Sequence, residues 1–240
     1  MPYRKFPKTD TGRLRALDTL LNNNNIYVAR QRFLDWQLIN KAQTMHNQLL
    51  TQSNQFMSCY KAQMRNYRRI AKPGRNMMLY STHFLKVLTM SIERGEIKAS
   101  VLKSYYNLDT NEGSKLWHDM KDIDFVRQIT PQIISGEKKR IANGGRPIYN
   151  PAIGLVATHY DIYCQLYEQQ QILNDKANSN LESLKALRVE VDALLKQIWD
   201  IVEEYFASEP TELRYDKCRE YGIVYYYRAK EKQALTPQQQ

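Results

Sequence analysis

A long amphipathic stripe in the second half of the chain constrains the fold more than any other feature of the sequence. Between Leu181 and Phe206, apolar residues recur at alternating spacings of three and four, and no Gly or Pro interrupts them. Because 3.6 residues make one helical turn, this spacing keeps the apolar side chains on one face of a helix. The stripe consists of Leu184, Leu187, Val191, Leu194, Ile198, Ile201 and Tyr205. The sequence therefore predicts a long helix that packs against other helices.

A second stripe with the same period precedes the first. It consists of Ile153, Val156, Tyr160, Tyr163 and Tyr167. Pro151 lies where the first turn of a helix tolerates a missing N–H group. A polar run at 174–180 separates the two stripes. This order predicts two antiparallel helices joined by a short turn, with one continuous helix as the alternative.

The first half of the chain has similar but less regular stripes. Thr9 and Asp10 are good N-cap residues for a short helix that ends with the asparagine run 22–25, and a helix over about 26–50 follows. The next stripe predicts a helix whose buried residues are Met57, Tyr60, Met64, Tyr67 and Ala71. We expect Pro73-Gly74 to end this helix, and a new helix to end near Gly95.

Several shorter elements are predicted from turn-forming residues and local periodicity. They are a helix over 102–108, a loop at 109–114, a helix over 121–142 that Pro131 shortens or kinks, a connector at 143–151, a helix over 211–220 capped by Gly222, and an extended or docking segment at 223–228. The predicted fold is all-α, with long antiparallel helices that form a bundle. Residues 1–110 form a basic helical half, 111–228 a second helical half and 229–240 a polar tail.

The two halves are weakly similar in sequence. Phe84, Leu85, Lys86, Leu88 and Ile92 match Leu194, Leu195, Lys196, Ile198 and Val202 at a constant offset of 110. Further along, Tyr106-Asn107-Leu108 matches Tyr221-Gly222-Ile223 after a five-residue insertion. Amphipathic helices share their apolar spacing, so both internal duplication and chance similarity account for the match.

The positive charge is distributed unevenly along the chain. The net charge is +10, with +11 in residues 1–120 and −1 in residues 121–240. Residues 36–92 contain eight basic residues and no Asp or Glu. Helix surfaces ordinarily mix the two signs, so this stretch lacks its usual local partners. The asymmetry indicates either an anionic partner or an acidic counterpart within the molecule.

A basic stripe within this stretch is the candidate nucleic-acid or anion-binding site. It consists of Lys61, Arg65, Arg68, Arg69, Lys72 and Arg75. Nucleic-acid binding requires Lys and Arg to neutralise phosphates, often beside aromatic rings. Tyr60 and Tyr67 lie nearby, but both belong to the apolar stripe, so we expect them to be packed. A solvated face and a face that docks an acidic partner are the alternatives.

No familiar catalytic or metal-binding pattern is recognisable in the sequence. The four histidines are scattered and the three cysteines are isolated, so we expect no catalytic residue, metal site or cofactor. Gly144-Gly145 beside Arg146 could expose backbone N–H groups to an anion, but an interhelical turn is the favoured interpretation. The tyrosine cluster at 221–227 is either buried or part of a protein interface.

Three further segments point to a family resemblance. They are Pro2-Tyr3-Arg4 followed by Thr9-Asp10 and Arg13-Leu14-Arg15-Ala16-Leu17, the run Gly-Gly-Arg-Pro-Ile-Tyr-Asn-Pro at 144–151, and Lys217-Cys218-Arg219-Glu220-Tyr221-Gly222. With these segments the chain resembles a family of uncharacterised, mainly helical proteins from Bacteroidetes bacteria. The resemblance implies a bacterial cytoplasmic helical protein and supplies no activity.

These observations support two hypotheses about function. The first is a non-enzymatic interaction or structural role, with a protein partner or self-association. The alternative is sequence-independent nucleic-acid binding through the helix around 61–75. The first residues lack the apolar core of a signal peptide, and no apolar run is long enough to span a membrane. We therefore expect a cytoplasmic protein without a membrane span.

Overall fold

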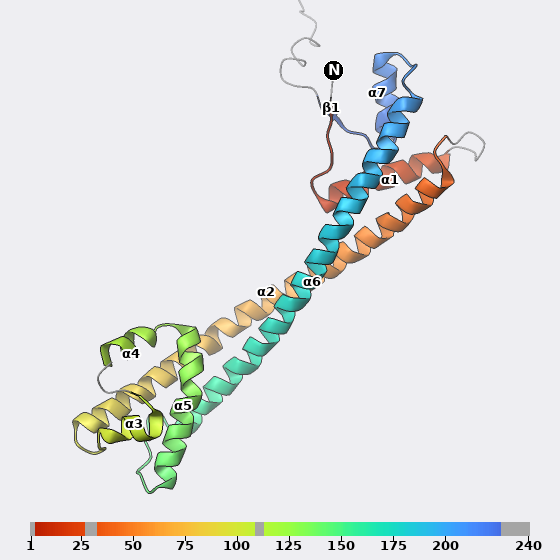
Figure 1. Cartoon of the computed structure of the whole chain (residues 1–240). Helices are drawn as coiled ribbons and strands as arrows, with labels where there is room; N and C mark the ends of the chain where they lie inside the picture. Colours follow the sequence, from red (N-terminus) through yellow and green to blue (C-terminus); the bar gives the residue numbers. More distant parts are fainter. Residues whose placement is uncertain (1–2, 27–32, 109–112, 227–240) are drawn as a thin grey trace, which may run out of the picture. The chain divides into compact units, whose positions relative to one another are not determined.

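The structure, a computed structural model, describes residues 3–26, 33–108 and 113–226, and these residues are mostly helical (Figure 1). The helices are α1 (Asp10–Ile26), α2 (Trp36–Glu93), α3 (Ser100–Tyr106), α4 (Gly113–Asp119), α5 (Ile123–Ala142), α6 (Ile153–Tyr205) and α7 (Thr211–Glu220). Two short strands, β1 (Tyr3–Arg4) and β2 (Tyr225–Tyr226), pair antiparallel. The predicted all-α fold of long, packed helices is confirmed.

The chain forms two compact units that each combine separate segments. Unit 1 contains residues 1–59 and 176–240, and unit 2 contains residues 60–175. The division expected from the sequence instead placed 1–110 and 111–228 in separate halves. The difference arises because α2 and α6 are so long that the two ends of each helix pack with different neighbours.

The core of unit 2 is built from the C-terminal part of α2, the N-terminal part of α6, and helices α3 and α5. Its fully buried apolar residues include Met77, Phe84, Leu88, Tyr106, Val126, Ile133 and Val156. Helix α3 approaches α5 closely at Gly136, where a Cβ atom would lie 2.6 Å from the carbonyl oxygen of Tyr105. Only glycine permits this contact.

The core of unit 1 is built from α1, the N-terminal part of α2, the C-terminal part of α6, and α7. Its fully buried apolar residues include Leu17, Leu20, Leu49, Leu184, Leu195, Ile198 and Trp199. Two bidentate ion pairs join α1 to α6. Arg13 donates to both carboxylate oxygens of Asp192, and Arg188 donates to both carboxylate oxygens of Asp10. Paired guanidinium donors fix the orientation of the two helices as well as attracting them.

The predicted turn at 174–180 is wrong, because α6 continues through this run. The run contains no Gly or Pro, and its polar side chains have partners on α2. In unit 2, Asn174 Oδ1 accepts a hydrogen bond of 2.8 Å from Gln63 Nε2. In unit 1, Asn180 Nδ2 lies 3.2 Å from Cys59 Sγ and Ala177 is buried. The polar run therefore belongs to a helix that packs through polar contacts.

The predicted helix end at Pro73-Gly74 is also wrong, because α2 includes both residues. A proline inside a helix removes one backbone hydrogen bond and clashes with the preceding turn. Packing offsets this cost at the adjacent Gly74, which is buried. A Cβ atom there would lie 2.7 Å from Ile123 Cδ1 and 3.1 Å from Tyr163 Cε2. Tertiary contacts thus hold the helix together at its weakest point.

The remaining helix predictions agree with the structure to within a few residues. Helix α1 includes the asparagine run and ends directly after it, and α2 begins at Trp36 rather than near residue 26. Helices α3, α5 and α7 match the predicted elements, and Pro131 lies inside α5. Gly95 and Gly222 follow their helices with φ of +74° and +84°. Residues 27–32, 109–112 and 227–240 lie outside the described residues, and α4 was not predicted.

The order of the helices repeats along the chain. A helix, a very long helix and a short helix follow one another as α1, α2 and α3, and again as α5, α6 and α7. The residues matched at an offset of 110 are buried in both copies, as Phe84, Leu85 and Leu88 and as Leu194, Leu195 and Ile198. This order supports the internal duplication, which stays a prediction. No helix in the described part of the chain is long and apolar enough to cross a membrane.

Candidate functional site

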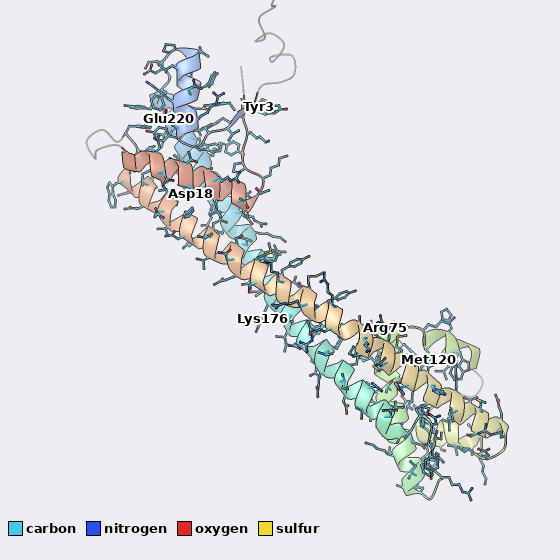
Figure 2. The ribbon with its side chains drawn as sticks, turned by 180° about the vertical axis from the view of Figure 1, so that it is seen from behind. Tyr3, Asp18, Arg75, Met120, Lys176 and Glu220 are labelled. Atoms are coloured by element: carbon cyan, nitrogen blue, oxygen red, sulfur yellow. The ribbon has the colours of Figure 1, made fainter. Side chains whose placement is uncertain are left out.

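The six residues of the predicted basic stripe lie on the part of α2 that belongs to unit 2. We call them the basic face: Lys61, Arg65, Arg68, Arg69, Lys72 and Arg75. All six side chains are exposed. Figure 2 labels Arg75 at the C-terminal end of this face. The structure therefore brings together, on one helix surface, all the residues predicted for the site.

The basic face points away from the helix side that packs against α6. Successive residues of a helix are rotated by about 100°, so Lys61, Arg68 and Lys72 each lie about 120–160° round the helix from the buried positions Asn66 and Gly74. Helix packing consequently covers none of the six charged groups.

The basic face also lacks acidic partners. Within 3–26, 33–108 and 113–226, no ion pair involves any of its six residues. The absence of Asp and Glu from residues 36–92 explains part of this result, because Asp or Glu one helical turn away would supply the usual partners. A dense group of unpaired cations produces a strong positive potential that attracts anions.

The predicted burial of Tyr60 and Tyr67 is wrong. Tyr60 is 44% exposed and Tyr67 is 64% exposed, and the other members of their stripe are exposed as well. The sequence pattern gave the wrong face because the side of α2 that packs against α6 is partly polar in unit 2. That side consists of Gln63, Asn66 and Ile70, which are each one residue before a member of the apolar stripe (Met64, Tyr67 and Ala71) and so lie about 100° away from it round the helix. Both tyrosine rings therefore lie on the solvent side, next to the basic face.

Polar side chains hold this part of α2 against α6. Asn66 is 3% exposed, and its Nδ2 donates to Gln170 Oε1 at 3.0 Å and to the carbonyl oxygen of Leu166 at 3.1 Å. Gln170 in turn donates to Asn174 Oδ1 at 2.8 Å. Sequence reasoning missed this row, although Gln63, Asn66 and Ile70 repeat the three–four spacing of a buried face.

The connector at 143–151 forms a turn between α5 and α6, packed on a buried ion pair in unit 2. Arg140 donates to both carboxylate oxygens of Glu137 at 2.8 Å, and to the carbonyl oxygen of Arg146 at 2.6 Å. Tyr106 also donates to Glu137. Burial and this bond to a carboxylate raise the pKa of Tyr106. The carboxylate is fully engaged, so the cluster stabilises the turn and leaves no charge for a ligand.

The other residues considered from the sequence are dispersed. Among the described residues, no three His, Cys, Asp or Glu side chains are placed to hold a metal ion. In the tyrosine cluster, Tyr221 is buried and the Tyr225 hydroxyl donates to Glu203 Oε1 at 2.6 Å, whereas Tyr226 is 45% exposed. Tyr227 lies outside the described residues. The cluster is thus partly core and partly surface.

Comparison with known proteins identifies no relative: no protein family, no curated protein and no solved structure matches the chain. The resemblance to helical proteins of Bacteroidetes therefore stays a prediction.

Proposed function

We propose that this protein is a non-enzymatic binding protein whose basic face on α2 binds nucleic acid without reading its sequence. One observation carries the proposal: six exposed basic side chains share a helix surface and have no acidic partner among the described residues. A cytoplasmic location, expected from the sequence, is part of the same proposal.

The length of the basic face suits a run of phosphates. Lys61 and Arg75 are separated by 14 residues, which corresponds to about 21 Å at the helical rise of 1.5 Å per residue. A DNA duplex rises about 3.4 Å per base pair, so the face would extend along roughly six base pairs. Phosphate contacts fix position but carry no sequence information, which agrees with the lack of a recognisable base-reading motif.

The exposed tyrosines add a second type of contact. Bases stack on aromatic side chains in single-stranded complexes, and this stacking tolerates any sequence. Tyr67, at 64% exposed, has its ring on the solvent side of α2, close in sequence to Arg65, Arg68 and Arg69. Single-stranded nucleic acid is therefore the preferred form of the ligand in this proposal.

An acidic protein is the second candidate partner. Met64 is 38% exposed beside the same cations, and interfaces with proteins are enriched in Met, Tyr and Arg. Such a partner would contact the apolar side chains and the cations together. With either partner, nucleic acid or an acidic protein, the proposed role of the chain is non-enzymatic.

A direct binding measurement tests the proposal and separates the two candidates. Labelled 20-nucleotide single strands and duplexes, and labelled poly-glutamate, are titrated with the wild type and with the triple variant Arg65→Glu, Arg68→Glu, Arg69→Glu. The control variant Lys98→Glu, Lys121→Glu, Lys138→Glu changes the net charge equally at exposed sites of unit 2 outside the basic face. We expect only the first variant to lose nucleic-acid binding. Binding of poly-glutamate alone, or equal losses in both variants, would contradict the proposal.

A further inference from the structure

Unit 1 contains a pocket that the proposed function does not use. Its volume is about 670 Å³, within the range typical of sites for small molecules. The lining comes from the N-terminal arm at 5–9, from α1, from Trp199 of α6, and from the end of α7 with the segment 222–225 that follows it. Figure 2 labels Asp18 on α1 and Glu220 at the end of α7, two of the elements that border the pocket.

Two contacts hold the arm in place beside the pocket. The backbone N–H of Lys5 donates to the carbonyl oxygen of Val224 at 2.8 Å. The ring of Phe6 lies 5.0 Å from the ring of Trp199, measured between centroids. Together with Ala16 and Ile223, these rings give the pocket an apolar lining.

The charged lining residues are all basic. They are Lys5, Lys8, Arg15 and Arg219. Arg219 pairs with Asp216 at 2.6 Å, whereas Lys5, Lys8 and Arg15 are exposed and form no ion pair within the described part of the chain. An apolar lining bordered by unpaired cations is complementary to a ligand with an apolar body and a negative head.

Trp199 lies beneath this apolar lining. Its side chain is fully buried, and its indole Nε1 has no hydrogen-bond partner among the described residues and is closed to solvent. The residue therefore gives the pocket an apolar floor, and the cations at the edge of the pocket would supply the polar contacts to a ligand.

We propose that this pocket binds a small amphipathic carboxylate. The apolar chain lies against Phe6, Trp199 and Ile223, and the carboxylate is attracted by Lys8 and Arg15. This binding is independent of the basic face on α2, which belongs to unit 2 and would attract a polyanion.

The test is calorimetric titration of the full chain with decanoate, below the concentration at which it forms micelles. Neutral 1-decanol serves as the matched uncharged probe, and vesicles of anionic lipid distinguish a membrane surface from a free carboxylate. We expect saturable binding of decanoate that is at least tenfold tighter than binding of decanol. Equal affinities, decanoate that fails to bind, or binding to vesicles alone would overturn the proposal.

Variants then locate the binding. Thr19→Trp fills the pocket from an exposed position on α1 and is expected to abolish decanoate binding. Lys8→Glu with Arg15→Glu should weaken it at least tenfold, whereas Lys41→Glu with Lys196→Glu, at exposed sites elsewhere in unit 1, should leave it unchanged. Circular dichroism confirms that each variant is folded. Full affinity in the folded Thr19→Trp variant would overturn the assignment to this pocket.

Discussion

Asn107 and Gly222 both have a positive φ at the end of a short helix, with Asn107 directly after α3 and Gly222 one residue further on, after the C-cap Tyr221 of α7. Their φ values are +50° and +84°. The residues on either side are buried in both places, as Tyr106 and Leu108 in unit 2, and as Tyr221 and Ile223 in unit 1. These are the two tripeptides that match in sequence. The backbone hydrogen bonds at the two helix ends differ, because the N–H of Leu108 donates to the carbonyl oxygen of Leu102 and the N–H of Ile223 donates to that of Cys218.

The close surroundings of Gly222 give a first prediction. A Cβ atom at Gly222 would lie 2.7 Å from the carbonyl oxygen of Ala16. The left-handed conformation itself costs an ordinary residue about 1–2 kcal/mol. We expect Gly222→Ala to lower the free energy of unfolding by about 2 kcal/mol, and Asn107→Gly to change it by less than about 0.5 kcal/mol. Urea denaturation measures both, and equal small effects would show that the contact with Ala16 is unimportant.

A second prediction concerns the polar pair that joins α2 to α6 in unit 2. Asn66→Ala leaves Gln170 Oε1 without its donor in a buried position, which typically costs about 1–3 kcal/mol. Replacing both Asn66 and Gln170 by Leu removes the unpaired group, so the double variant should be about as stable as the wild type. Denaturation of the wild type, Asn66→Leu, Gln170→Leu and the double variant gives the coupling energy. A double variant less stable than Asn66→Ala would argue against a polar pair that apolar packing can replace.

A third prediction follows from the raised pKa of Tyr106. Burial and the bond to Glu137 raise it above the ordinary tyrosine value of about 10. As pH rises past about 10, the unfolded chain loses this proton while the folded protein keeps it. The unfolded state then binds fewer protons, so the free energy of unfolding decreases with pH.

Replacing the tyrosines one at a time isolates this contribution. Tyr106→Phe should make the loss of stability above about pH 10 less steep, because one proton no longer dissociates from the unfolded chain alone. Tyr149 is 81% exposed, so Tyr149→Phe is the control and should follow the wild type. Urea denaturation at intervals from pH 7 to pH 11.5 measures both slopes. A Tyr106→Phe slope that equals the wild-type slope would show that this proton does not stabilise the fold.

The all-α fold and most of its helices could be predicted because apolar stripes recur with the helical period along α5 and α6, and because turn-forming residues mark both ends of α7. The errors lie where packing outweighs local preference. Gly74 allows α2 to continue past Pro73 through contacts with Ile123 and Tyr163. Nothing in the local sequence indicates these contacts, which come from residues at least 49 positions away in the chain.

The composition of the candidate site was predicted, but its surroundings were not. The six basic residues could be identified because they share a helix face in a stretch without Asp or Glu. The exposure of Tyr67 could not, because it depends on Asn66 taking the buried position through its bonds to Gln170 and Leu166. By hydropathy, a tyrosine is expected in the interior more often than an asparagine. Here Asn66 is buried and Tyr67 is exposed, because hydrogen bonds to α6 hold Asn66 against that helix.

The measurement that tests the proposed function most directly is the salt dependence of nucleic-acid binding. If the six cations of the basic face each neutralise one phosphate, the logarithm of the association constant for single-stranded DNA should fall with the logarithm of salt concentration at a slope of about −4. The variant Arg65→Glu, Arg68→Glu, Arg69→Glu should reduce the magnitude of that slope by about 2, while the variant Lys98→Glu, Lys121→Glu, Lys138→Glu should retain it. An affinity independent of salt, or a slope that the first variant leaves unchanged, would contradict nucleic-acid binding by the basic face.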